Sequence, residues 1–166
     1  MKRLSRIIRH LLSGHFAVKS AFPRRSLRAI EQAIQESEAT HSGQIRFAVE
    51  ASLDFRALLH NQSSRDRAIE VFSQLRVWDT EHNNGVLIYL LLADRTVEIL
   101  ADRGIHIKSG DAAWKTICHD MEAAFRQGRF EAGSIDGIHA VGRHLRHHFP
   151  GKQASPNELP DQPVVL

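Results

Sequence analysis

The feature that most constrains the fold is a run of apolar residues in the middle of the chain, residues 85–93. It is too short for a surface helix, and it lacks the alternation of polar and apolar residues that a half-exposed strand shows. Strands that are apolar throughout are typical of sheets covered on both faces. We therefore predict that this segment is the central, most buried strand of a sheet. It falls well short of the roughly 20 residues that a membrane-spanning helix needs.

Two neighbouring segments have the pattern of further strands. Residues 44–51 alternate strictly between apolar and polar side chains, which predicts a strand with one buried face. Residues 96–101 follow the polar pair Asp94–Arg95 and also alternate, so we predict a hairpin with the central strand. A helix between the first two strands forms a crossover and makes them parallel, whereas the hairpin is antiparallel.

Apolar residues at intervals of three and four predict five helices. The segments are residues 1–12, 26–43, 64–77, 111–128 and 130–149. Ser26 and Asp111 are residue types that cap helix N-termini. The order of elements predicts an α/β fold, namely an α/β/α sandwich in which a mixed β-sheet has helices on both faces.

The chain is predicted to form one domain with an extension at each end. Residues 1–22 are an amphipathic basic helix and a lead-in, and residues 23–151 are the α/β domain. Residues 152–166 form an extended tail whose three prolines exclude regular structure, although its last four residues could pack onto the domain. The N-terminal helix is expected to dock on the domain, and the alternative is contact with an anionic membrane surface.

Cysteine content and charge indicate the compartment and the partners. A secretory signal separates a basic segment from an apolar one, whereas residues 1–12 mix the two. The single cysteine, Cys118, excludes an internal disulfide and a thiolate metal cage, and it favours a cytoplasmic location. The basic residues do not interleave with aromatic ones as in single-strand binders, so no sequence-specific nucleic-acid partner is expected.

Several short motifs occur in an order and spacing that resemble one known family. They are HSGQIR at 41–46, NNGVLIY at 83–89, ADRGI at 101–105 followed by Trp114, and the run 125–150. Together they resemble the TPM-domain family, in particular its short cytoplasmic bacterial type, over roughly residues 27–151. The residues that carry the match are Gly43, Arg46, Asn84, Gly85, Asp102, Gly104 and Trp114.

The resemblance implies an α/β/α sandwich, which agrees with the pattern of elements. It also implies binding of calcium or magnesium through acidic loop residues, and some members, including thylakoid-lumen proteins, hydrolyse phosphate esters. Many secreted members have an aspartate just before the first long helix, where this chain has FPRRS at 22–26. That departure weakens the transfer of either property to this chain.

Three acidic residues are expected at the carboxyl end of the parallel strands. They are Glu50, Asp54 and Asp94. Ligands of open α/β sheets bind beyond this end, and carboxylates suit a hard cation such as calcium or magnesium. The alternatives are a salt bridge for Glu50, a solvated loop position for Asp54 and a turn-forming role for Asp94.

The start of the first long helix is a candidate anion site beside these acids. Arg24, Arg25 and Ser26 lie there, and a helix N-terminus with arginines attracts phosphate groups. A weaker candidate is a zinc site at His144 and His148, which are four residues apart on one helix face. Cys118 is interpreted as core filler rather than as a nucleophile.

The leading functional hypothesis is a cytoplasmic TPM-domain module that binds a divalent cation, an unknown protein partner, or both. The first alternative is metal-assisted hydrolysis of phosphomonoesters, for which no nucleophile is identified. The second alternative is a peripheral membrane-surface adaptor that uses the N-terminal helix.

Overall fold

The computed structural model describes residues 2–151 and 157–166 of the chain. Met1, which belongs to the predicted N-terminal helix, and residues 152–156 of the predicted tail lie outside the described residues. Within them the centre of the molecule is a four-stranded sheet of order β3-β2-β1-β4. Its strands are β1 (Gln44–Glu50), β2 (Gly85–Leu91), β3 (Thr96–Ala101) and β4 (Val164–Val165).

The sheet is mixed, as predicted. β1 pairs in parallel with β2, from Gln44 opposite Gly85 to Glu50 opposite Leu91. β2 pairs antiparallel with β3 through the predicted hairpin, and every residue of β2 is buried. The prediction that the apolar run forms an interior strand with cover on both faces is therefore confirmed.

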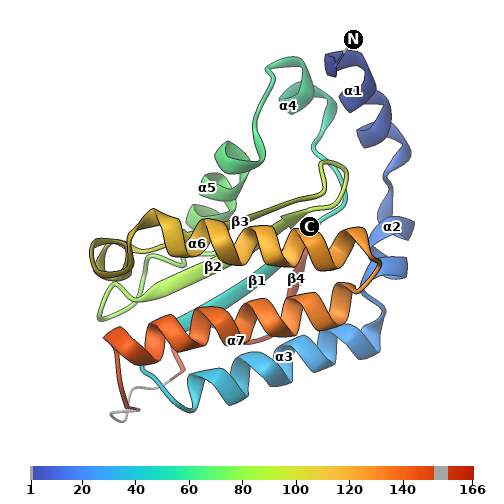
Figure 1. Ribbon diagram of the computed structural model, residues 1–166. Helices are drawn as coiled ribbons and strands as arrows, with labels where there is room; N and C mark the ends of the chain where they lie inside the picture. The colour runs from blue at the N-terminus through green and yellow to red at the C-terminus, as the bar shows by residue number, and fades with distance from the viewer. Residues whose placement is uncertain (1, 152–156) are drawn as a thin grey trace.

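Helices lie on both faces of the sheet, so the α/β/α sandwich is confirmed (Figure 1). One face carries three helices: α3 (Arg24–Glu38), α6 (Arg103–Arg126) and α7 (Phe130–His148). The other face carries α4 (Phe55–Leu59) and α5 (Ser64–Gln74). Two further helices, α1 (Lys2–Leu12) and α2 (His15–Ala21), lie beside the end of the sheet at which β1 and β2 finish (Figure 1).

Each face of the sheet has its own apolar core. Phe47 and Ile88 point into the core formed with α3, α6 and α7, whereas Ala48, Leu87 and Tyr89 point into the core formed with α5. β1 is consequently buried along its whole length, and the prediction of one buried face was wrong for this strand. The polar side chains of β1 are hydrogen-bonded. Gln44 and Arg46 bond to the C-terminal tail, and Glu50 bonds to α5.

Two helices begin elsewhere than predicted. Pro23 precedes the first turn of α3, and Ser26 lies inside that turn, where its Oγ donates to Glu131 Oε2 at 2.6 Å instead of capping the helix. α6 begins at Arg103 because Asp102 accepts a hydrogen bond from the Arg103 N–H. Gly110, with φ of 68°, kinks this helix just before the predicted start at Asp111, whose side chain lies outside the described residues.

The C-terminal tail contains a short strand, contrary to the prediction from its prolines, whereas the expectation that its last four residues could pack onto the domain is confirmed. Val164 lies opposite Ala48 in a short parallel pairing of β4 with β1. The Gln44 side-chain oxygen accepts from the backbone N–H groups of Glu158 and Leu159, at 2.9 and 3.0 Å. Prolines are tolerated here because β4 is an edge strand.

A buried histidine predicts how the stability of this fold depends on pH. His41 lies after α3, where Nδ1 donates to the Gly43 carbonyl and Nε2 accepts from the Ser37 hydroxyl. Burial lowers its pKa to about 4, helped by the nearby charge of Arg146 and opposed by the bond to Gly43. The unfolded chain therefore binds this proton more tightly than the folded protein does.

We expect the contribution of His41 to the free energy of unfolding to be fully present above about pH 6.5. Between pH 6.5 and 4 the contribution should fall by up to about 1.4 kcal/mol per pH unit. Urea unfolding at several pH values measures this slope. His41→Asn should flatten it, whereas His139→Asn, at an exposed position, should leave it unchanged. Equal slopes in the wild type and His41→Asn would contradict the assignment.

Candidate functional site

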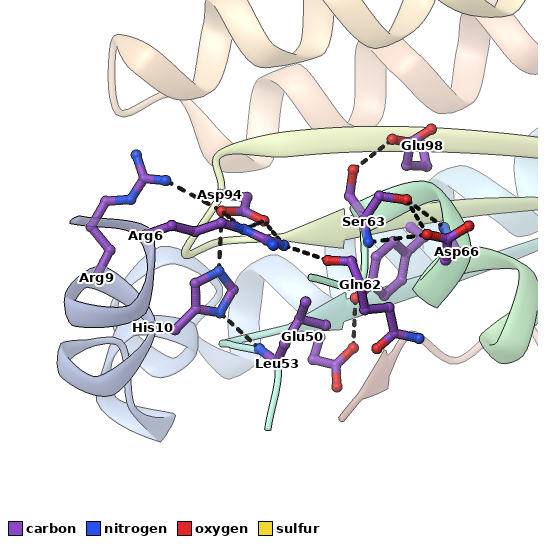
Figure 2. Close-up of polar contacts among 12 residues, drawn as sticks. Arg6, Arg9, His10, Glu50, Leu53, Gln62, Ser63, Asp66, Asp94 and Glu98 are labelled. Atoms are coloured by element: carbon purple, nitrogen blue, oxygen red, sulfur yellow. Dashed lines mark hydrogen bonds and ion pairs between the residues drawn. The ribbon is translucent and has the colours of Figure 1, made fainter. Parts of the chain in front are cut away.

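The carboxyl end of β2 carries a partly buried charge network centred on Asp94. Arg6 of α1 contacts both carboxylate oxygens, with Nε at 3.0 and 3.1 Å and Nη2 at 2.7 Å (Figure 2). The same Nη2 donates to the Gln62 carbonyl at 2.8 Å. This two-pronged arrangement is the strong geometry for an arginine and a carboxylate. It attaches the N-terminal helix to the turn between β2 and β3.

His10 completes the network from the next turn of α1. Its Nε2 lies 3.0 Å from Asp94 Oδ1, and its Nδ1 accepts from the Leu53 backbone N–H at 2.9 Å. A backbone N–H can only donate, so the hydrogen bond from Leu53 requires an unprotonated Nδ1. The ring proton is thus on Nε2 and is donated to Asp94. The side chain of His10 is fully buried, which locks this tautomer in place.

The partners of Asp94 determine its charge. Burial by itself would raise its pKa, but the hydrogen bonds from Arg6 and His10 outweigh burial and hold the pKa below the usual aspartate value. Asp94 is therefore a carboxylate at neutral pH. A second cation, Arg9, lies on the exposed side of the same helix, with its Nη2 3.3 Å from Asp94 Oδ1.

Glu50, the last residue of β1, has a separate set of partners. Arg67 of α5 donates through Nε and Nη2 at 2.9 and 3.0 Å, and the Tyr89 hydroxyl donates at 2.6 Å. Burial raises the pKa of Tyr89, and its hydrogen bond to the Glu50 carboxylate raises the pKa further. The salt-bridge interpretation of Glu50 is confirmed. The carboxylate stabilises the packing of α5 on the sheet.

Asp54 has a local role. Its side chain accepts from the Ala57 N–H at 2.8 Å and caps α4. Among the residues the structure describes, no group of three or more histidine, cysteine or acidic residues is arranged to hold a metal ion. The three predicted acids thus have different partners at the same end of the sheet, and cation binding by them stays a prediction.

The predicted anion site is shared with an acidic residue of α7. Arg24 and Arg25 are exposed at the start of α3, and Ser26 is buried against the Glu131 carboxylate. A protein carboxylate thus already lies beside this helix N-terminus. Anion binding by the three residues stays a prediction.

The histidines of the weaker zinc candidate contact other rings. His144 packs on Trp114 with the ring centres 5.3 Å apart, and His148 packs on His147 at 4.7 Å. Burial, with help from Arg143 and His147, lowers the pKa of His144. Burial also raises the pKa of the Cys118 thiol to about 12, which suits the interpretation of this cysteine as core filler.

Most motif residues of the sequence lie at the opposite end of the sheet and shape the fold. Gly85 and Gly104 have backbone carbonyls of other segments, those of Val77 and Asn83, where a β-carbon would be. Arg46 donates to the carbonyl of Pro160 in the tail. Asn84 donates to the Ser42 carbonyl at 2.8 Å. These residues position strands, and none of them contacts the Asp94 network.

The family model for the TPM domain matches residues 19–144 of this chain. The chain belongs to the TPM domain family. A solution structure of the BA42 protein from the psychrophilic bacterium Bizionia argentinensis is similar to this TPM-domain protein, with 34% identity and a TM-score of 0.75. The match covers 86% of this chain and 93% of the BA42 chain.

A second solution structure supports the fold alone. The N-terminal domain of a P. gingivalis protein matches at 22% identity with a TM-score of 0.58, over 71% of this chain and 72% of that chain. No curated protein gives a significant match. Among the described residues, no helix has both the length and the apolar character required to cross a membrane.

The Asp94 network predicts a large effect of a small substitution. Asp94→Asn leaves the partly buried Arg6 guanidinium without its counter-charge, so we expect a loss of about 2 kcal/mol in the free energy of unfolding. Urea denaturation measures the loss. Asp79→Asn is the matched control because its ion pair with Arg76 is exposed, and its effect should stay within about 0.5 kcal/mol.

The same pair of proteins tests cation binding at this position. A calcium ion that binds the Asp94 carboxylate would stabilise the wild type more than Asp94→Asn, because a ligand that binds only the folded state raises its melting temperature. The melting temperatures of both proteins in excess calcium and in chelator give the calcium-induced shift of each protein. Identical calcium shifts in both would exclude Asp94 as a ligand.

Proposed function

We propose that this TPM-domain protein is a peripheral adaptor that attaches to anionic membrane surfaces through α1 and α2. The observation that carries the proposal is an outward-facing group of large apolar side chains on these two helices. Its members are Leu4, Ile8, Leu11, Leu12 and Phe16, with exposed fractions of 65, 48, 68, 81 and 86%.

The apolar side of α1 faces outward because the polar side is held by the domain. Arg6 and His10 point inward to Asp94, and Ile7 packs against the core beneath α5. An amphipathic helix on a globular protein ordinarily turns its apolar side to the core. Here the orientation is reversed, so the apolar side is available for another surface. Contiguous exposed apolar patches of this kind mark interaction sites.

Charge favours a lipid surface as the partner. The first acidic residue of the chain is Glu31, and eight lysines and arginines precede it. Arg9 and Lys19 are exposed beside the apolar group, and the Lys19 ammonium lies 6.0 Å from the centre of the Phe16 ring. Basic residues next to an apolar helix face are the composition that binds anionic leaflets, such as the cytoplasmic one.

The expected energy is sufficient for reversible attachment. Full burial of one large apolar side chain contributes about 1.5–3 kcal/mol, and each basic residue near an anionic leaflet contributes about 1 kcal/mol. The sum of several such contributions exceeds the binding energy of a single lipid anchor, which by itself gives only marginal membrane binding. Because part of the energy is electrostatic, the attachment should weaken with added salt.

Sedimentation with lipid vesicles tests the proposal. The protein should bind vesicles of phosphatidylcholine with phosphatidylglycerol and not vesicles of phosphatidylcholine alone. Leu11→Gln combined with Phe16→Gln should weaken binding more than tenfold, because both side chains would insert. Ile69→Gln is the matched control, since Ile69 is also exposed and apolar but lies on α5, outside the proposed membrane surface.

Two results would contradict the proposal. One is equal binding of the double variant and the wild type to anionic vesicles. The other is an association between protein molecules, in sedimentation equilibrium without lipid, that the double variant abolishes while vesicle binding is absent. That result would assign the apolar face to a protein contact.

A further inference from the structure

A cavity of about 500 Å³ lies behind the hairpin of β2 and β3. Its walls come from the corner between α1 and α2, from the end of β2, and from the junction of α6 with α7. The apolar part of the lining includes Leu12, Ala17, Leu90, Leu92, Phe125 and Phe130. The volume is within the range of roughly 300–1,000 Å³ that is typical of small-molecule sites.

Three arginines from different elements line the same cavity: Arg9, Arg95 and Arg126. Among the described residues, the contacts of two of them to acids are long, Arg9 at 3.3 Å to Asp94 and Arg126 at 3.4 Å to Glu122. Within the described part of the chain, the Arg95 side chain makes no hydrogen bond or ion pair. Glu122 is occupied, since its other oxygen accepts from the Val97 N–H at 3.0 Å. The lining therefore combines an apolar wall with excess positive charge.

The backbone of Arg95 is in an unfavourable conformation. Its φ of 56° lies in the left-handed region, which glycine and asparagine adopt at lower cost. Two of the other non-glycine residues described with positive φ are indeed asparagines, Asn61 and Asn83. Arg76 also has a positive φ, of 52°, and does not line the cavity, so the positive φ of Arg95 belongs to its place in the turn between β2 and β3.

Thr96 and Gly128 also line the cavity, Thr96 at the start of β3 and Gly128 between α6 and α7. Their backbone amides therefore report on a ligand that enters it.

We propose that this cavity binds an amphipathic monoanion of the long-chain carboxylate class. The aliphatic chain lies against the apolar wall, and the carboxylate is held by Arg95 with Arg9 and Arg126 around it. The anion is recognised through the two donors of a guanidinium, and the chain through burial of apolar surface. Leu12 belongs to both the proposed membrane surface and the cavity wall, but the two proposals are tested separately because neither Leu11 nor Phe16 lines the cavity.

Titration calorimetry with decanoate, below its micelle concentration, tests the proposal on the full chain. Decanoate should bind at one site and shift the amide signals of Thr96 and Gly128, whereas acetate and 1-decanol should each bind at least tenfold more weakly. Arg95→Asn should weaken decanoate binding at least tenfold while its unfolding midpoint is unchanged or raised, because asparagine relieves the backbone strain.

The matched control is Arg76→Asn. Arg76 is also an exposed arginine with positive φ, at 52°, and it does not line the cavity. Its substitution should leave decanoate binding unchanged. The variant with Leu11→Gln and Phe16→Gln should also bind decanoate normally, even if vesicle binding is lost.

Three outcomes would overturn the proposal. Binding of decanoate that Arg95→Asn leaves unchanged would remove the assigned head-group contact. Acetate binding as tight as that of decanoate would reduce the site to a patch of positive charge. Absence of heat and of amide shifts with decanoate would show that the cavity does not take this class of ligand.

Discussion

The architecture depends on the need to cover β2 on both faces. A strand without polar alternation has no side that can face water, so one layer of helices is not enough. The chain supplies α3, α6 and α7 on one face and α5 on the other. At the start of β2, Gly85 has no side chain, which lets the backbone carbonyl of Val77 lie close to the strand. The hairpin then places Asp94 just beyond this buried segment, at the margin of the core.

The position of Asp94 has consequences for the N-terminal helix. A carboxylate with a side chain only 11% exposed needs a partner, and Arg6 and His10 supply it from α1. The helix is thereby oriented by its polar side, and its apolar side is left outward. The outward orientation of Leu4, Ile8, Leu11 and Leu12 on α1 follows from these contacts together with the packing of Ile7. Attachment to the domain and the proposed attachment to lipid thus use opposite sides of the same helix.

The corner between α1 and α2 also forms one wall of the cavity behind the hairpin. Leu12 and Ala17 contribute to it, and Arg9 belongs both to the Asp94 network and to the lining. The turn that holds α1 therefore also presents Arg95 to the cavity. One end of the sheet combines a structural ion pair, an exposed apolar surface and a cationic cavity, whereas the motif residues Asn84, Gly85 and Gly104 lie at the other end.

The sequence by itself determined the elements whose signal is local. Alternation and apolar continuity predicted the strands, helical spacing predicted α5 and α7, and the order of elements predicted the sandwich. The resemblance of short motifs indicated the family. The capping role of Asp102 is also a local signal, which gives α6 its early start. The sequence also placed Glu50, Asp54 and Asp94 at one end of the sheet, because that follows from strand direction alone.

Tertiary structure alone decided the partners of these residues. Asp94 pairs with Arg6 across 88 positions and Glu50 with Arg67 across 17, and no periodicity of the sequence relates such residues. The sequence predicted that the amphipathic basic N-terminal helix docks on the domain, but not which side of the helix would dock. The side that docks is decided by Asp94, because the packed sheet and its helices leave this carboxylate without a partner until α1 supplies Arg6. The same holds for β4, because a tail with three prolines pairs only where an edge of the finished sheet accepts it.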